Sequence, residues 1–295
     1  MIFVDGAPVA MRQLRGVRTM MIPLKAQSND FLGRFREVIS DPLNLLIDRV
    51  PLAGVVDGDQ VYLHNGNRVP LVGDGTYYGS FSQLLVVNRG VHEPLEEYVF
   101  QNVLKFVGDA PVMLELGAYW GHYSMWLKKV RPRATVFLVE PDAANLNAGI
   151  NNFKRNGFTG EFIQSAVGRD HLQVDRFLTG RQLERINILH VDIQGYEVEM
   201  LEGCGRSLAE RYIDYLFVST HSQAIHEHIM AKINKFGYRV EVSSDFDHET
   251  TSNDGLVFAS SPNVRQVFEH FQPIGRMKIV NSHPRDLLQA LLEIR

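Results

Sequence analysis

Residues 112–152 constrain the fold more than any other part of this 295-residue chain. A short apolar run ends on an acidic residue, Glu115, and a glycine turn from Gly117 to Gly121 leads into an amphipathic segment. A second apolar run, residues 134–139, ends on Glu140. The order strand, glycine turn, helix, strand and acid is typical of the first half of a nucleotide-binding βαβ unit.

The glycine turn distinguishes two kinds of nucleotide ligand. A dinucleotide site uses G-x-G-x-x-G to hold a pyrophosphate at a helix N-terminus, whereas this turn contains only Gly117 and Gly121, with bulky aromatic residues between them. Glu115 beside the turn repels phosphate and suits a cationic amino-acid group, and Glu140 can accept both hydroxyls of a ribose. The turn therefore favours S-adenosylmethionine over NAD. The alternative is an ordinary strand–turn–helix joint in which Glu140 only flanks a helix.

Composition limits the function further. Apolar residues make up 45% of the chain and charged residues 22%, as is usual for a soluble globular protein. The net charge of −4 gives no general reason to expect nucleic acid or an anionic membrane as a partner. Cys204 is the only cysteine, which favours a reducing compartment. The first 20 residues lack the apolar core of a signal peptide, and no apolar run is long enough to span a bilayer. We therefore expect a cytoplasmic protein.

The sequence pattern predicts further elements on both sides of this unit. Helices are expected over residues 31–39 and 93–107, with a hairpin at residues 55–63. A helix over residues 142–156 is expected to stop at Gly157. The other predicted elements are strands at residues 161–167, 186–191, 215–219 and 256–259 and an amphipathic helix at residues 285–295. We expect this last helix to dock on the core or to pair with a second copy of the chain in a homo-oligomer.

Acidic residues recur at the ends of the predicted parallel strands. Glu115, Glu140 and Asp192 each end a strand, and open α/β sheets bind ligands at the carboxyl ends of their strands. His221 follows a fourth strand and can act as a general base near neutral pH. Its alternative is a histidine at the start of a helix with no chemical role. We expect His226, on that helix, to face solvent.

A polar loop at residues 245–249 raises the question of a metal site. Together with His221 it contains imidazoles and carboxylates that can bind a divalent ion. The sequence has no H-E-x-x-H or comparable ligand spacing, however. We therefore expect no metal.

Several motifs resemble those of the FkbM family of S-adenosylmethionine-dependent methyltransferases. They are Glu115-Leu116-Gly117-Ala118-x-x-Gly121, Val139-Glu140-Pro141, Val191-Asp192-Ile193-Gln194-Gly195-Tyr196-Glu197 followed by Leu201-Glu202-Gly203, and the lead-in Gly90-x-His92-Glu93-Pro94. The resemblance covers about residues 90–259. The chain departs from the family pattern at Tyr119, where Asn is frequent, and at Gln194, where Glu is common.

This resemblance implies an α/β fold, namely a Rossmann-like seven-stranded class I methyltransferase sheet with helices on both faces. Residues 90–262 would form the S-adenosylmethionine-binding methyltransferase domain. Residues 1–89 would be an N-terminal extension that serves as a substrate lid or oligomerisation segment, and residues 263–295 a C-terminal helical extension. The expected activity is O-methylation of a sugar hydroxyl in a glycan, polysaccharide or glycosylated natural product. A nicotinamide-dependent oxidoreductase and a non-catalytic nucleotide-binding module are the alternatives.

The motifs and the strand ends together assign three sets of site residues. The cofactor-binding set is Glu115, Gly117, Ala118, Tyr119, Gly121, Glu140, Pro141, Ser165, Ala166 and Asp192. The candidate catalytic residues are His221 and Asp192. The candidate substrate residues are Tyr77, Tyr78, Glu93, Gln194, Glu197 and His248. No nucleic-acid partner is expected.

Overall fold

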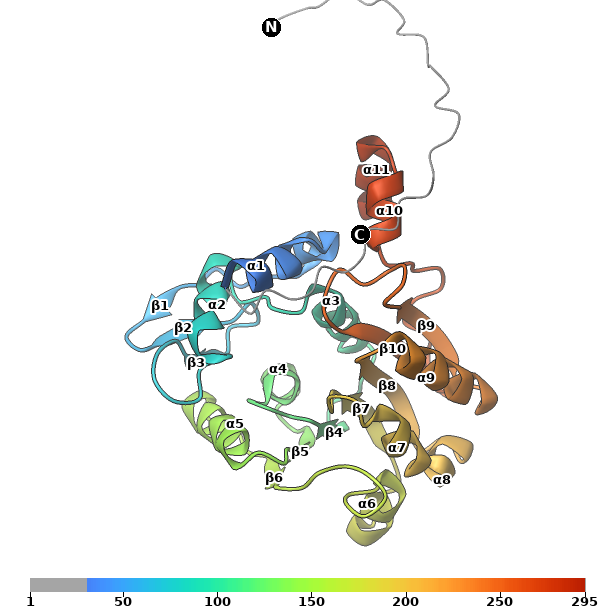
Figure 1. Ribbon diagram of the computed structural model, residues 1–295. Helices are drawn as coiled ribbons and strands as arrows, with labels where there is room; N and C mark the ends of the chain where they lie inside the picture. Colours follow the sequence, from blue (N-terminus) through green and yellow to red (C-terminus); the bar gives the residue numbers. More distant parts are fainter. Residues whose placement is uncertain (1–30, 295) are drawn as a thin grey trace, which may run out of the picture.

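The computed structural model describes residues 31–294, so the prediction about a signal peptide lies outside the described residues. Its centre is a seven-stranded sheet in the order β6-β5-β4-β7-β8-β10-β9 (Figure 1). The strands are β4 (Val112–Leu116), β5 (Thr135–Val139), β6 (Glu161–Ile163), β7 (Ile186–Val191), β8 (Ile213–Thr220), β9 (Arg239–Ser244) and β10 (Gly255–Ser260). β10 is antiparallel to both of its neighbours, β8 and β9. The remaining pairs, β6–β5, β5–β4, β4–β7 and β7–β8, are parallel. The predicted Rossmann-like sheet is confirmed.

Helices cover both faces of this sheet (Figure 1). One face carries α3 (Pro94–Val103), α4 (His122–Val130) and α5 (Ala143–Asn156). The other carries α6 (Val174–Arg181), α7 (Glu197–Glu202), α8 (Gly205–Ala209) and α9 (Gln223–Lys235). Successive strand residues point to opposite faces, so Met113 packs in the core beneath α4 while Leu114 packs in the core beneath α6.

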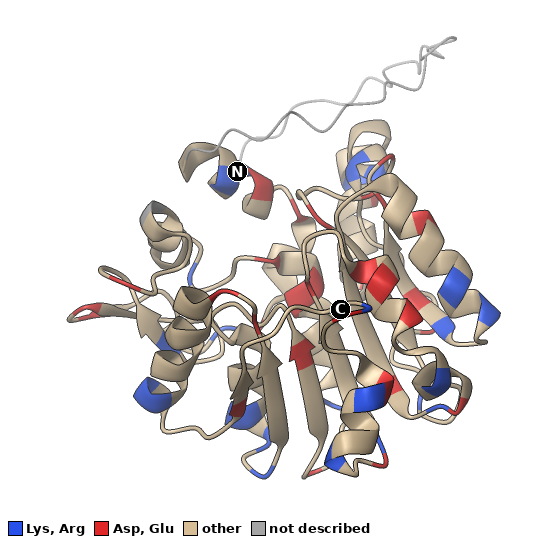
Figure 2. Cartoon of the chain, turned by 60° about the horizontal axis from the view of Figure 1, so that its bottom comes forward, with Lys and Arg blue, Asp and Glu red and all other residues tan. Residues whose placement is uncertain are grey.

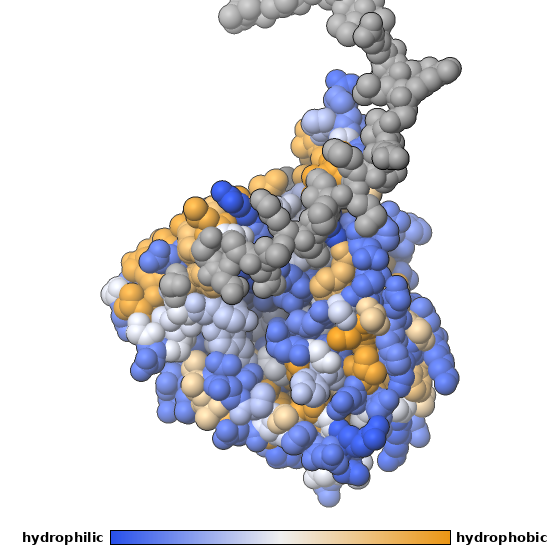
Figure 3. Space-filling view, in the orientation of Figure 1, coloured by the Kyte–Doolittle hydropathy of each residue, from blue (hydrophilic) through white to orange (hydrophobic). Residues whose placement is uncertain are grey.

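The N-terminal region lies beside the α3–α5 face. It contains α1 (Phe31–Ile39), η1 (Pro42–Leu46), the small sheet of β1 (Val56–Asp57), β2 (Gln60–Tyr62) and β3 (Arg68–Pro70), then η2 (Gly79–Ser82) and α2 (Gln83–Val87). The predicted helix at residues 31–39 and the hairpin are confirmed. The region is tied to α5, because the backbone N–H of Arg68 donates to Asn156 Oδ1 at 2.8 Å. Exposed apolar side chains gather over it at the upper left of Figure 3, among them Val55, Val56 and Val87.

Two short helices end the described chain, α10 (Arg276–Asn281) and α11 (Pro284–Ile294). Leu288 and Leu292 of α11 are more than half exposed, while the Tyr98 hydroxyl donates to the backbone oxygen of Ile294 at 3.2 Å. Whether α11 pairs with a second copy stays a prediction. Across residues 31–294 no helix combines the length and apolar character needed to cross a membrane.

Two predicted strand boundaries were wrong. Glu115 lies inside β4 rather than at its end, because the ladder with β7 continues to the pair Leu116–Val191. The strand predicted over residues 161–167 ends at Ile163, because its partner β5 ends at Val139, the residue paired with Ile163.

Two further predictions also need correction. The helix predicted over residues 93–107 ends at Val103. His226 does not face solvent: it is 3% exposed, and its ring nitrogens contact the hydroxyls of Thr220 at 3.0 Å and Ser243 at 2.9 Å. These two hydroxyls, one from β8 and one from β9, provide hydrogen-bond partners for both ring nitrogens of His226. The helical pattern alone could not predict these partners and therefore indicated an exposed side chain.

Candidate functional site

The glycine turn after β4 passes very close to the backbone at the end of β7. Gly117 has a φ of +75°, and a Cβ at this position would lie 1.6 Å from the backbone oxygen of Asp192. Only glycine permits this approach. The backbone N–H groups of Gly117 and Ala118 both donate to the backbone oxygen of Val139 at 2.9 Å. The turn therefore holds the ends of β4, β5 and β7 together.

Glu140 lies where the turn meets the end of β5. Its carboxylate accepts hydrogen bonds from the backbone N–H groups of Tyr119 at 3.0 Å and Asp142 at 3.1 Å, and from the side-chain amide of Asn145 at 3.4 Å. A carboxylate has about four acceptor positions, so capacity remains for a hydroxyl group of a ligand. Glu140 is thus held in place by the protein without being saturated by it.

Two cavities meet at this edge of the sheet. The aromatic cavity, of about 380 Å³, has Tyr77, Tyr78, Tyr119, Trp120 and Tyr123 among its lining residues. The loop cavity, of about 520 Å³, has Pro141, Ala166, Val167, Ile193 and Tyr196 among its lining residues. Gly117, Glu140, Asp192 and Gln194 line both. Each cavity is within the usual size range of small-molecule sites, and Glu140 lies at their junction.

The aromatic cavity is acidic. Four carboxylates line it, those of Glu93, Glu115, Glu140 and Asp192, and none of the described residues in its lining is Lys or Arg. Acidic segments are visible near the upper ends of the central strands in Figure 2. Burial raises the pKa of Glu115, which accepts a hydrogen bond from the backbone N–H of Ser124 at 3.1 Å. His190 also lines this cavity, and although burial lowers its pKa, the charge of Glu96 outweighs burial and raises the pKa to about 8. This imidazole offsets part of the negative charge, but the four carboxylates still favour a cationic ligand over a pyrophosphate.

His221 lies among three carboxylates just after β8. Its Nδ1 atom is 2.7 Å from Glu197 Oε1, and its Nε2 atom is 3.2 Å from Asp192 Oδ1 and 3.3 Å from Asp254 Oδ1. Burial lowers the pKa of His221, but the hydrogen bonds to Asp192 and Glu197 outweigh burial and raise the pKa to about 10. The ring is therefore an imidazolium near neutral pH. An imidazolium has no lone pair to accept a proton, so this environment favours a positioning role for His221 over the predicted role as a base.

Asp254 is a site residue that sequence reasoning missed. It precedes β10, whose antiparallel register pairs Gly255 with Thr220, and this pairing brings Asp254 beside His221. Burial raises the pKa of Asp254 to about 7, with repulsion from Asp192 adding to the effect and His221 opposing it. No local motif marks this aspartate, because its position depends on a pairing between distant strands.

A third cavity, the hydroxyl cavity, continues from the aromatic cavity. Its lining includes Arg34, Glu93, Asp192, Ser219, Thr250 and Asp254. Glu93 and Asp192 also line the aromatic cavity, and Asp192 lines all three cavities. The N-terminal region closes one side, because Arg34 Nη2 donates to the Tyr77 hydroxyl at 2.8 Å and Glu37 Oε1 accepts from the backbone N–H of Asn253 at 2.9 Å.

The structure brings most of the predicted site residues to these cavities. Those that line at least one cavity are Glu115, Gly117, Ala118, Tyr119, Glu140, Pro141, Ala166, Asp192, Tyr77, Tyr78, Glu93 and Gln194. Five others line none of the three. Gly121 is the N-cap of α4, Ser165 donates to the backbone oxygen of Ala166, and His248 is exposed beside Asp245. His221 touches the cavities only through its neighbours Asp192 and Asp254, and Glu197 is buried behind it.

The fold and these cavities define a class, the Rossmann-like α/β proteins that bind a ligand at the carboxyl ends of parallel strands. Residues 151–240 match the family model described as the Methyltransferase FkbM domain. This match, which contains Asp192 and the strand before it, confirms the resemblance to the FkbM methyltransferases. No curated protein matches the chain.

Several solved structures resemble this one at low sequence identity. An rRNA methylase from Streptococcus thermophilus has a TM-score of 0.43 at 11% identity, covering 56% of this chain and 95% of its own. TrmK from M. capricolum, in complex with S-adenosyl-homocysteine, has a TM-score of 0.41 at 11% identity, covering 58% and 71%. A precorrin-6y C5,15-methyltransferase from Geobacter metallireducens has a TM-score of 0.41 at 14% identity, covering 58% and 89%.

Proposed function

We propose that this protein is an S-adenosylmethionine-dependent O-methyltransferase that methylates a hydroxyl of a sugar, in a glycan, polysaccharide or glycosylated natural product. The family match supports the methyltransferase class. The observation that carries the rest is the position of Asp192, which lines all three cavities. A cofactor that spans the loop and aromatic cavities and an acceptor in the hydroxyl cavity would meet at this carboxylate.

S-adenosylmethionine fits the residues of the first two cavities. Ala166 and Ile193 offer apolar walls to an adenine ring, and Glu140 at the junction can accept ribose hydroxyls. The acidic lining of the aromatic cavity suits the ammonium and sulfonium groups of the methionine part. NAD fits less well in the aromatic cavity, because a pyrophosphate there would face Glu115 and Asp192. The only described arginine in the two linings, Arg169, lies in the loop cavity. When bound, the cofactor supplies an electrophilic methyl group.

The hydroxyl cavity is only about 40 Å³, so it would admit one hydroxyl group of a sugar acceptor rather than a whole ring. Its hydroxyl and carboxylate groups, with Arg34, offer several donors and acceptors to this hydroxyl group. Tyr78, which is 53% exposed and lines the neighbouring aromatic cavity, presents a ring with an apolar face and a polar tip. Acidic walls oppose a phosphate backbone, which supports a sugar rather than a nucleic-acid acceptor.

The described residues can also accept the proton that the hydroxyl loses. Partial deprotonation of a weak nucleophile contributes roughly 10²–10⁴ in rate. Asp192 and Asp254 both face His221, and the pKa of Asp254 is about 7. We assign the proton to this carboxylate pair and assign His221 the task of positioning it. Alignment of the acceptor oxygen with the methyl group contributes a further ~7–11 kcal/mol of barrier lowering.

In this proposal the chain consists of an N-terminal extension (residues 1–89), a methyltransferase domain (residues 90–262) and a C-terminal extension (residues 263–295). The described part of the first segment acts as a lid, because Arg34, Glu37 and Tyr77 enclose the acceptor side of the site. Acceptor choice then depends on residues that lie outside the sheet.

The first test is ligand binding followed by methyl transfer. S-adenosylmethionine and S-adenosylhomocysteine should raise the thermal midpoint of the protein, and NAD should not. Labelled methyl groups should then pass from S-adenosylmethionine to members of a panel of oligosaccharides and not to a tRNA transcript. If neither S-adenosylmethionine nor S-adenosylhomocysteine binds, the cofactor assignment is refuted. Methylation of the transcript with no methylated sugar would refute the acceptor assignment alone.

A further inference from the structure

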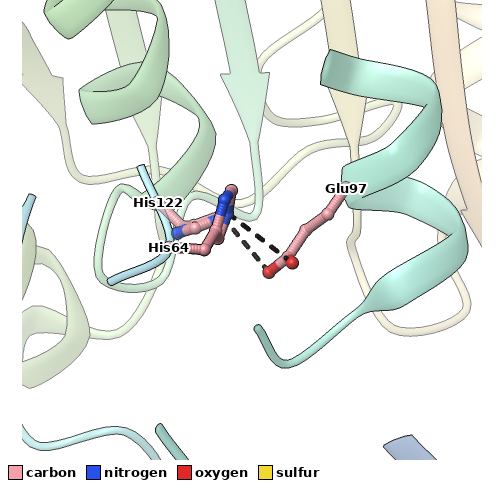
Figure 4. A group of neighbouring side chains, drawn as sticks. All are labelled: His64, Glu97 and His122. Carbon is pink, nitrogen blue, oxygen red and sulfur yellow. Dashed lines mark ion pairs between the residues drawn. The ribbon is translucent and has the colours of Figure 1, made fainter. Parts of the chain in front are cut away.

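A buried group of two histidines and a glutamate lies apart from the catalytic cluster. His64 is in the turn between β2 and β3, Glu97 is in α3, and His122 is the first residue of α4. All three are at most 2% exposed. Figure 4 shows both imidazole rings directed at the carboxylate of Glu97. Three elements that are distant in sequence thus place three possible metal ligands at one point.

The distances within the group resemble those of a coordination shell. His64 Nε2 lies 3.6 Å from Glu97 Oε2, and His122 Nε2 lies 3.5 Å from Glu97 Oε1. One ligand atom from each residue lies within 4.8 Å of the others. Both contacts are longer than hydrogen bonds. Two ligands of a tetrahedral zinc ion, each about 2.0–2.1 Å from it, are roughly 3.3–3.4 Å apart.

Several polar atoms of this group have no hydrogen-bond partner among the described residues. They are Nε2 of His64, both ring nitrogens of His122 and Oε2 of Glu97. A buried polar group without a partner loses its hydrogen bonds to water and gains none in return, which destabilises the folded protein. Aromatic rings occupy the surroundings, since the ring centroid of His64 lies 4.4 Å from that of Trp126 and the ring of His122 stacks on Trp120 at 5.8 Å. A cation among these atoms would satisfy the ligand atoms together.

The protonation states also suit metal binding. Burial lowers the pKa of His64 and of His122, and the charge of Glu97 does not reverse this in either case. For His64, the backbone of Asp48 also opposes the effect of burial. Burial raises the pKa of Glu97, but the neighbouring histidines outweigh burial and hold the pKa below its usual range. Neutral imidazoles and an ionised carboxylate are the forms that bind metals.

His92 supports the group from outside. Its Nδ1 atom lies 2.7 Å from Glu97 Oε1, and although burial lowers the pKa of His92, the charges of Glu97 and Glu93 raise it overall. This contact holds the Glu97 carboxylate in place. Ligating carboxylates in metal sites commonly have such a partner.

We propose that His64, Glu97 and His122 bind one zinc ion that ties the β2–β3 turn and α3 to the start of α4. Two imidazoles and a carboxylate suit zinc, whereas magnesium prefers oxygen ligands and water. His122 directly follows the glycine turn and lines the aromatic cavity, so the ion also fixes the backbone beside the cofactor site. This proposal differs from the expectation of no metal, which considered only local ligand spacing, and it does not depend on the proposed activity.

The first experiment measures metal uptake by the full-length protein. Purified protein is depleted with a chelator, dialysed against Zn²⁺ or Mg²⁺, and its metal content is measured by inductively coupled plasma mass spectrometry. We expect one zinc per chain, a rise in the thermal midpoint with Zn²⁺, and neither effect with Mg²⁺. Co²⁺ should bind in its place and give the intense visible bands of a tetrahedral site. Absence of stoichiometric zinc uptake would overturn the proposal and leave a histidine–carboxylate network without a metal.

The second experiment assigns the ligands. His64→Gln and His122→Gln should each weaken zinc binding by more than the roughly 10–100-fold that loss of an outer partner costs. His226→Gln is the matched control, because His226 is equally buried but has two hydroxyl partners, and it should keep the zinc. If either ligand variant folds poorly, the Co²⁺ spectrum of the unaltered protein still tests the tetrahedral site. Unchanged zinc affinity in both ligand variants would overturn the assignment.

Discussion

Two clusters in this protein use the same residue types in opposite proportions. The open cluster at the sheet edge is His221 with Asp192, Glu197 and Asp254, and the closed cluster in the interior is Glu97 with His64, His92 and His122. The open cluster surrounds one histidine with three carboxylates, and the closed cluster surrounds one carboxylate with three histidines. Their chemistry differs accordingly.

In the open cluster the excess of carboxylates keeps protons on the site. The pKa of His221 rises to about 10 and that of Asp254 to about 7, so a proton can be exchanged near neutral pH. In the closed cluster the single carboxylate stays ionised while burial keeps His64 and His122 neutral. The ratio of acids to histidines, together with burial, decides whether a cluster offers protons or lone pairs.

The largest effect is expected for Asp192→Asn, which breaks the open cluster where the three cavities meet. Methyl transfer to the sugar acceptor should fall by about 10²–10⁴, because the carboxylate pair that accepts the proton loses a member. Initial rates with saturating cofactor measure this fall. Asp245→Asn is the control, since Asp245 contacts His248 outside the three cavities, and it should keep near-normal turnover. Equal rates in the two variants would remove Asp192 from the reaction.

The closed cluster should respond in stability rather than in proton transfer. Glu97→Gln removes the carboxylate that three buried histidines share and leaves Glu93 beside His92 alone. Breaking a buried pair of this kind costs about 3–5 kcal/mol. Because the pKa of Glu97 is lowered in the folded protein, its contribution is present above the unfolded value of about 4.3 and is lost as the pH falls below it. Denaturant unfolding at several pH values measures both effects. A variant as stable as the parent protein at neutral pH would contradict this account.

Most of the open cluster could be predicted from the sequence, because short local patterns mark the strand ends on which its residues lie. An apolar run followed by an acid places Glu140 and Asp192 at the ends of β5 and β7, and the glycine turn places the approach at Gly117. Asp254 was not predictable in this way. Its position beside His221 follows from the antiparallel pairing of β10 with β8. The sequence pattern of one strand does not indicate which other strand it pairs with.

The closed cluster could not be predicted from the sequence, for two physical reasons. Its three proposed zinc ligands come from a hairpin turn, a helix and the start of another helix, so they form no spacing motif. Each also has a sufficient local explanation, as when Glu97 in the first turn of α3 suits the helix dipole. The N-terminal region supplies His64, and only its packing against α3 and α4 joins the three residues.

A sharper test of the cavity junction is Glu140→Gln. The amide keeps the shape of the side chain but removes the charge that a ribose hydroxyl would meet, so cofactor affinity should fall by about 5–30-fold, or about 1–2 kcal/mol. Isothermal titration with S-adenosylhomocysteine measures the change. Glu161→Gln serves as the control, because Glu161 pairs with Arg181 away from the cavities. Unaltered affinity in Glu140→Gln would place the ribose elsewhere.

The smallest effect concerns pH and tests whether the open cluster exchanges protons as its carboxylate excess implies. Asp254 must be deprotonated to help accept the hydroxyl proton, and its pKa is about 7. The turnover rate should therefore rise with pH through this value and level off above it, with a fall of about tenfold per pH unit well below it. Asp254→Asn should lower the rate and remove this limb of the profile. A profile that keeps the same limb in the variant would assign the titration to another group, because an asparagine cannot titrate in this range.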